Sequence, residues 1–136
     1  MRLATGLILA VGVLAAPGLG AGAALAQDHG QGERLALFHC GRCHVVNEKN
    51  RMGGIGSTPS FAVMRGQPDF EAKMRGFHAL RPHPAFTRIP GVTAPFPENR
   101  PSPIHPVDLT EAELDRIVDY ALTLAPADLG RPLGTR

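Results

Sequence analysis

Apolar residues recur at helical spacing most clearly near the end of the chain. The recurring positions are Leu114, Ile117, Val118, Ala121 and Leu122. Thr110 and Glu113 stand before this run, three residues apart, which is the pattern of a capping box at a helix N-terminus. Pro126 cannot continue a helix. The pattern therefore predicts an amphipathic helix that begins after Thr110, ends before Pro126 and buries its apolar face.

Three shorter helices are predicted upstream of this one, over residues 32–43, over residues 59–65 and from residue 68 onward. The third has an apolar stripe, because Phe70, Met74 and Phe77 recur at i, i+4 and i+7. Residues 45–58 are rich in glycine, asparagine and charge and are predicted to form a loop. These elements predict an all-α fold of three to four short helices.

A proline-rich stretch separates the short helices from the last one. Residues 81–106 contain eight prolines in 26 positions, a density that no helix or internal strand tolerates. A loop of this length inside a small domain is usually functional or disordered. The stretch also carries five large apolar residues, Phe86, Ile89, Val92, Phe96 and Ile104. Because it has side chains to bury, we interpret it as an ordered loop that wraps the domain.

The first 26 residues have the features of a secretory signal peptide. A positive start, Met1-Arg2, precedes an uncharged run that ends in an A-x-A pattern at residues 24–26. Cleavage is expected after Ala26, which leaves residues 27–136 as an exported, periplasmic domain. The alternative is an uncleaved membrane anchor, because 24 uncharged residues are enough to span a bilayer.

Composition limits what a chain of 136 residues can be. It allows one small domain, too small for an enzyme with its own cofactor-binding domain. With no Trp, one Tyr and six Phe, aromatic side chains alone would make a thin core. The formal net charge is +2, and the arginines that supply most of the positive charge are scattered along the chain. No nucleic-acid partner is expected from this distribution.

The two cysteines of the chain form a C-x-x-C-H motif with the histidine that follows them. Cys40 and Cys43 are separated by two residues, and His44 comes next. Two thiols at this spacing can bond to the two vinyl groups of one haem, and the histidine provides an imidazole for its iron. We predict one covalent haem c per chain, attached at Cys40 and Cys43, with His44 as its proximal ligand. The porphyrin would also supply the apolar core that the side chains lack.

Three other uses of the cysteine pair are less favoured. A structural zinc site needs four nitrogen or sulfur ligands, and His39, Cys40, Cys43 and His44 are too crowded to surround one ion. A thioredoxin-like redox pair belongs in a fold with strands around it, and almost none are predicted here. A disulfide between the two cysteines is a third use, since disulfides occur in exported proteins.

The haem motif and the segments around it resemble the class I, mitochondrial-type c-type cytochromes. Gly32, eight residues before Cys40, stands where that family has a glycine that lets the C-terminal helix approach. Residues 117–122 resemble that helix, whose aromatic residue packs on the glycine. Residues 54–61 resemble the segment whose proline carbonyl accepts the N–H of the proximal histidine, a role that falls to Pro59. The resemblance implies a small cytochrome c fold, with short helices around one haem.

The chain departs from this family at the second axial ligand. The family usually has Met-Pro shortly before the C-terminal helix, whereas the corresponding place here reads His105-Pro106. His105 lies 61 residues after His44, a separation similar to that of the family's two ligands, and it is our first candidate for the distal ligand. His83, in a His-Pro-x-Phe segment, is the rival, and Met74 is third. An open sixth site is a further alternative.

These residues predict a periplasmic electron carrier rather than an enzyme. The haem iron would exchange one electron with redox protein partners, and no catalytic residue is predicted apart from the haem. Membrane association is expected only if the signal segment is retained. Two alternatives stay open. One is a haem protein whose open or weakly ligated sixth site takes a gas or peroxide, and the other is an electron-transfer subunit of a dehydrogenase or oxidase.

Overall fold

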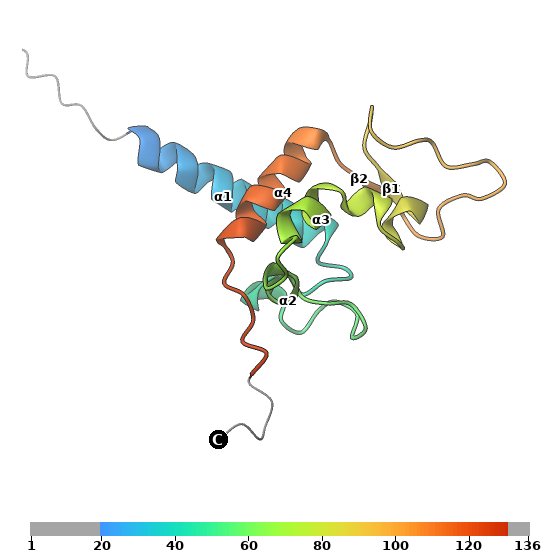
Figure 1. The fold of residues 1–136 in the computed structure, drawn as a ribbon. Coiled ribbons are helices and arrows are strands. Elements are labelled where there is room, and N and C mark those ends of the chain that lie inside the picture. The colour runs from blue at the N-terminus through green and yellow to red at the C-terminus, as the bar shows by residue number, and fades with distance from the viewer. Residues whose placement is uncertain (1–19, 131–136) are drawn as a thin grey trace, which may run out of the picture.

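A computed structural model of the chain describes residues 20–130 (Figure 1). The elements, with η for a 3-10 helix, are α1 (Gly20–His39), η1 (Glu48–Asn50), α2 (Phe61–Arg65), α3 (Phe70–Arg75), η2 (Phe77–Ala79), η3 (His83–Ala85), β1 (Thr87–Arg88), β2 (Val107–Asp108) and α4 (Glu111–Thr123). The two strands pair in parallel and have two residues each. The predicted helical class and helix number are therefore confirmed for the described part of the chain.

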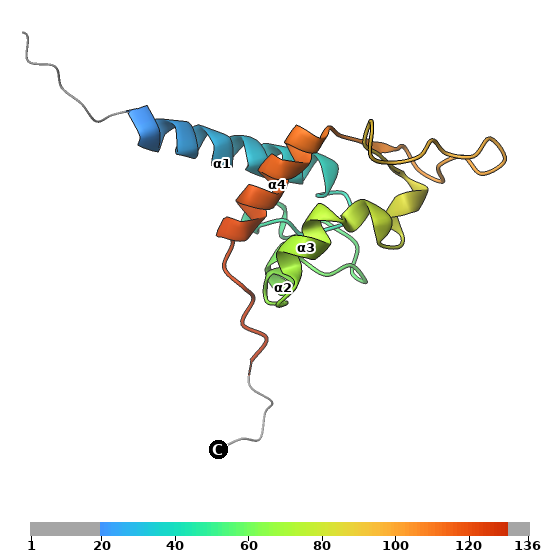
Figure 2. The same cartoon turned by 45° about the horizontal axis from the view of Figure 1, so that its top comes forward.

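The helices α1 and α4 cross at a close contact, which Figures 1 and 2 show from two directions. Gly32 makes this contact possible. A Cβ at this position would lie 2.2 Å from the carbonyl oxygen of Arg116 and 2.7 Å from the Cβ of Tyr120. Both distances are far below van der Waals contact, so only a glycine lets the two backbones meet here. The expected packing of the Tyr120 segment on Gly32 is confirmed.

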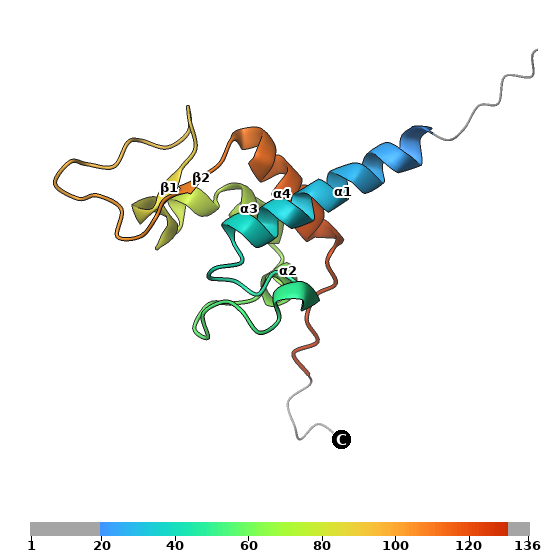
Figure 3. The same ribbon diagram turned by 180° about the vertical axis from the view of Figure 1, so that it is seen from behind.

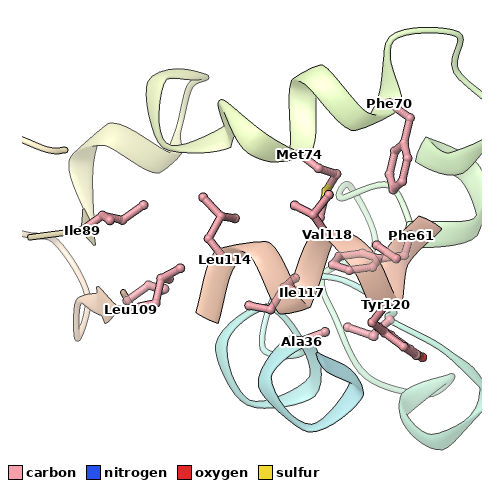
Figure 4. Close-up of a cluster of buried hydrophobic side chains, with 13 residues drawn as sticks. Ala36, Phe61, Phe70, Met74, Ile89, Leu109, Leu114, Ile117, Val118 and Tyr120 are labelled. Atoms are coloured by element: carbon pink, nitrogen blue, oxygen red, sulfur yellow. The ribbon is translucent and has the colours of Figure 1, made fainter. Parts of the chain in front are cut away.

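The helix α4 forms as the sequence predicts and lies at the centre of the core. The Thr110 hydroxyl accepts the backbone N–H of Glu113 at 3.2 Å, and the Glu113 carboxylate accepts the backbone N–H of Thr110 at 2.7 Å. Four of the five predicted apolar residues are buried, and the fifth, Leu122, is half-buried. Figure 4 shows side chains from the other helices around α4, among them Ala36, Phe61 and Met74.

The three shorter helices all begin at residues other than those predicted. Helix α1 begins twelve residues earlier and ends at His39, because the cysteines of the C-x-x-C-H motif form a turn rather than a last helical turn. Helix α2 begins at Phe61 rather than at Pro59. The reason is that Ser60 acts as the N-cap, with its hydroxyl accepting the N–H of Val63 at 3.2 Å.

The helix α3 begins at Phe70, two residues later than expected, and packs against α4. Its predicted apolar stripe is present: Phe70 and Met74 are buried, and Phe77, in η2, is half-buried. On the outer side of the same contact, the guanidinium of Arg75 lies 2.7 Å from a carboxylate oxygen of Asp115 in α4. The stripe and this ion pair together fix α3 alongside α4.

The proline-rich segment is ordered, but it is not free of regular structure as the sequence predicted. Residues 85–89 contain no proline, and within them β1 pairs with β2. The backbone N–H of Val107 donates to the carbonyl of Phe86 at 2.7 Å. Arg88 and Asp108 reinforce the pairing through two side-chain hydrogen bonds of 2.5 and 2.7 Å. Figure 3 shows the rest of the loop projecting from this stem, on the side opposite to the start of α1.

The apolar residues of this segment are only partly buried. Ile89 is buried, Phe86 and Phe96 are half-buried, and Val92 and Ile104 are exposed. The expectation of a loop with side chains to bury is thus confirmed in part.

Residues 1–19 and 131–136 are outside the described part of the chain. Most of the predicted signal peptide, residues 1–26, therefore lies outside it. The expected cleavage position, after Ala26, falls within α1. No helix in residues 20–130 combines the length and the apolar character needed to cross a membrane.

Candidate functional site

A mostly apolar cavity lies beside the C-x-x-C-H motif. Its volume is about 190 Å³. Its wall includes Cys40, Cys43, His44, Pro59, Met74 and His83. Protein interiors are normally close-packed, so a hollow of this size beside a cluster of cysteine and histidine side chains is the candidate binding site.

A tight turn after α1 presents the motif to the cavity. The backbone N–H groups of Cys43 and His44 both donate to the carbonyl of Cys40, at 3.0 and 2.8 Å. Gly41 is required inside this turn, because a Cβ there would lie 2.3 Å from the carbonyl oxygen of Leu37. The turn places both cysteines and the histidine on the cavity wall. The requirement for glycine at this position was not anticipated from the sequence.

The environment of the cysteines is apolar. Burial raises the pKa of the Cys40 thiol to about 12, and the neighbouring Cys43 adds to the shift. Redox-active and metal-binding cysteines work as thiolates and have lowered pKa values. The neutral Cys40 is therefore poorly suited to a thioredoxin-like pair. Within residues 20–130, no group of three or more His, Cys, Asp or Glu side chains is arranged to hold a metal ion.

The imidazole of His44 is held in one orientation. Its Nδ1 lies 2.8 Å from the carbonyl oxygen of Pro59, which only accepts hydrogen bonds, so Nδ1 carries the proton. Burial lowers the pKa of His44, and the hydrogen bond to Pro59 partly offsets this effect. The ring is therefore a neutral imidazole with an unprotonated Nε2, the form in which histidine binds metals. The hydrogen bond predicted between His44 and Pro59 is present.

Asn50 ties the loop after the motif to the motif itself. Its side-chain oxygen accepts the backbone N–H groups of Val46 and Asn47, at 2.8 and 3.2 Å. Its side-chain nitrogen donates to the carbonyls of His44 and Gly41, at 2.9 and 3.3 Å. The sequence predicts only that this residue is part of a polar loop. The sequence does contain a signal for a capping role, since Asn47 and Asn50 are three residues apart. In the structure these two asparagines form a capping box at the short helix η1.

His83 lies across the cavity from His44. The centroids of the two imidazole rings are 6.2 Å apart, and their planes are nearly parallel, at 9°. The Nδ1 atom of His83 lies 2.9 Å from the carbonyl oxygen of Leu80, which only accepts hydrogen bonds, so Nδ1 carries a proton. The rings of Phe77 and Phe86 meet it edge-on, with centroids at 5.1 and 5.7 Å. His83 is thus fixed in orientation in the same way as His44.

His105, the first candidate from the sequence, is placed differently. It is exposed, and its Nδ1 lies 3.0 Å from the carbonyl oxygen of the next residue, Pro106. It is not part of the cavity wall formed by residues 20–130, although the adjacent Ile104 is. Its own carbonyl accepts a hydrogen bond from the guanidinium of Arg42, inside the haem motif, at 3.2 Å. The structure therefore brings the backbone of His105 to the site but leaves its ring outside.

The third candidate, Met74, lines the cavity and is also part of the packed core. Figure 4 shows its side chain between α3 and α4, close to Val118. Of the remaining histidines, His39 is on the cavity wall and His29 is exposed. His78 has a buried Nδ1 without a hydrogen-bond partner and is not part of the wall.

Comparison of the chain with protein-family models, with curated proteins and with solved structures gave no match. The assignment of a function therefore rests on the motif and on the geometry of the cavity.

Proposed function

We propose that the chain is a monohaem c-type cytochrome that transfers single electrons between redox proteins. The observation that carries this proposal is the position of the C-x-x-C-H motif on the wall of a large apolar cavity. Cys40, Cys43 and His44 face one space, and the His44 ring is fixed by the carbonyl of Pro59. This is the residue set needed to attach a haem at two points and to bind its iron from one side.

The residues of the cavity fit a haem by their chemistry. The wall is mainly carbon, as an apolar macrocycle requires, and includes Leu109, Leu114 and Ile117. The two cysteines are buried or half-buried thiols beside this apolar space, and they would hold the haem covalently. When bound, the haem supplies one-electron chemistry, because its iron alternates between Fe(III) and Fe(II).

The chain has three tasks in this function. The Pro59 carbonyl orients the His44 ring, so that its Nε2 stays available to the iron. The apolar wall excludes water, which also helps to set the reduction potential. The rim offers a partner protein an apolar surface, because Leu80 and Ile104 line the cavity and are also exposed. These roles fit a small cytochrome c fold over residues 27–136, exported to the periplasm by the predicted signal peptide.

The proposal is tested by expressing the full chain in a bacterial host that matures c-type cytochromes. We expect the purified protein to keep its haem after denaturation and to gain the mass of one haem. It should also show the reduced pyridine adduct spectrum of a haem bound through two thioether bonds. The variant with both Cys40→Ser and Cys43→Ser should lose covalent haem, and the exposed surface variant His29→Ala should keep it. An exported, folded wild-type chain without covalent haem would refute the proposal.

A further inference from the structure

We infer that His83 is the second axial ligand of the haem iron, so that the iron is held between the imidazoles of His44 and His83. The inference rests on the proposed function, because it requires a haem in the cavity. It gives the distal position to a residue of the proline-rich segment other than His105.

The separation of the two rings fits one metal ion between them. An imidazole nitrogen binds a first-row metal ion such as zinc at about 2.0–2.1 Å. The ligating nitrogen lies about 1.1 Å from the centre of its own ring, so two imidazoles on opposite sides of such an ion have centroids about 6.3 Å apart. The observed separation between His44 and His83 is 6.2 Å.

Both rings are also prepared for this role in the same way. Each Nδ1 faces a backbone carbonyl, that of Pro59 for His44 and that of Leu80 for His83. In the neutral form of each ring, Nε2 is therefore the nitrogen that can bind a metal. A histidine that binds a metal usually donates its other ring N–H to such an acceptor, which fixes the ring and strengthens the ligand. Two aromatic rings, Phe77 and Phe86, restrain His83 further.

The other candidates lack this combination. The His105 ring is exposed and is not on the cavity wall. Met74 lines the cavity, but its side chain also fills the core between α3 and α4 (Figure 4). A thioether in such a position is more often a core residue than a ligand. Of the three candidates, His83 alone lines the cavity, lies 6.2 Å from the His44 ring between centroids, and has its Nδ1 fixed by a backbone carbonyl.

This ligand pair decides between the functions that a haem in this cavity allows. With both axial positions filled by protein, the iron is six-coordinate and low-spin, and it has no free site for a gas or a peroxide. Two histidines also give a lower reduction potential than a histidine and a methionine, because the thioether favours the reduced iron. The inference therefore specifies a low-potential electron carrier with a closed sixth site.

The test compares the haem-loaded wild type with His83→Ala and with His105→Ala as the matched control. We expect the wild type and His105→Ala to share low-spin absorption and electron paramagnetic resonance spectra. Neither protein should bind carbon monoxide when reduced. His83→Ala should lose the low-spin signal, become high-spin and bind carbon monoxide when reduced. Added imidazole should restore the low-spin spectrum of His83→Ala by filling the vacated position.

A second variant covers the case in which His83→Ala does not fold. His83→Met should keep covalent haem, acquire a methionine–iron charge-transfer band and shift the reduction potential upward. The inference is overturned if the His83 variants keep the wild-type spectrum and potential, if His105→Ala loses the low-spin signal instead, or if the wild type is high-spin. These results would leave the proposed function standing as long as the haem is covalently bound. A wild-type chain without covalent haem would overturn both.

Discussion

Two regions of the molecule border the same cavity and are held in opposite ways. At the crossing of α1 and α4, protein packs directly on protein: Val118 and Ala121 have no exposed surface, and Gly32 lets the backbones touch. In residues 81–106, Ile89 is fully buried, whereas Ile104 and Val92 remain exposed. The crossing is stabilised by its own contacts. The proline-rich segment borders the cavity, and part of its apolar surface is exposed.

This difference assigns separate tasks to the two regions. The crossing holds the C-x-x-C-H motif, because α1 runs directly into the turn at Cys40. The proline-rich segment supplies His83 and the outer wall of the cavity. We therefore expect the crossing to determine whether the chain folds. The occupant of the cavity should determine how well the outer wall is ordered.

The largest effect is expected from Gly32→Ala. The added Cβ would lie 2.2 Å from a backbone oxygen of α4, which cannot move without separating the helices. We expect a loss of about 3 kcal/mol or more in the free energy of unfolding, measured by urea titration of the haem-loaded protein. Gly30→Ala is the matched control, because its nearest atom would be 3.6 Å away and alanine favours a helix by about 0.8–1.0 kcal/mol. Equal stability of the two variants would mean that the crossing is not the stabilising contact described here.

A smaller, local effect is expected from emptying the cavity. Under the proposed function a haem fills the cavity, and the Cys40→Ser and Cys43→Ser double variant would remove it from the outer wall, which includes Phe86 and Val107. Backbone amides of residues 81–106 should then exchange with solvent much faster than in the haem-loaded wild type, as measured by hydrogen exchange and mass spectrometry. Amides of α4 should lose less protection. A uniform loss over both regions would show that they unfold as one unit.

The smallest effect is expected at Glu33, on the outer part of α1. Its carboxylate oxygens lie 2.7 Å from the Nζ of Lys49 and 2.7 Å from the side-chain nitrogen of Asn47. The hydrogen bond from Lys49, with further contributions from its charge and from Asn47, lowers the pKa of Glu33 against an opposing effect of burial. A lowered folded-state pKa stabilises the protein above the ordinary pKa of glutamate, and this contribution is lost as the pH falls through the lowered value.

Glu33→Gln should therefore reduce the free energy of unfolding at pH 7 by up to about 1 kcal/mol. The difference from the wild type should disappear at acid pH, below the lowered pKa of Glu33. Thermal unfolding at a series of pH values measures both quantities. A difference that stays constant down to the acid end would assign the effect to packing instead of charge.

Local signals allowed much of the fold to be predicted. The capping box at Thr110 and the apolar face of α4 depend on residues within two helical turns, and both are present. The close approach of α1 and α4 at Gly32 was predicted from the resemblance to class I c-type cytochromes. The start of α2 was misplaced because the hydroxyl of Ser60 caps the helix, an interaction that outweighs the suitability of Pro59 for a first turn.

The site was harder to predict, because it depends on contacts between segments far apart in the chain. The spacing of Cys40, Cys43 and His44 is typical of a haem-attachment motif, and the structure places all three on one cavity. Spacing along the chain favoured His105 as the distal ligand. The strand pairing at the base of the proline-rich segment brings His83 to the cavity and leaves the His105 ring outside, and no local pattern encodes that pairing.

The stem of the proline-rich loop has a consequence for protein engineering. The strand pair and the two hydrogen bonds between Arg88 and Asp108 close the loop at its base, so residues 91–103 leave and rejoin the body at a fixed point. The entropic free-energy cost of closing a flexible loop grows slowly with the length of the loop, by about 0.6 kcal/mol for each doubling. The tip of this loop is therefore a site at which a recognition peptide could be inserted while the fold that supports the cavity is retained.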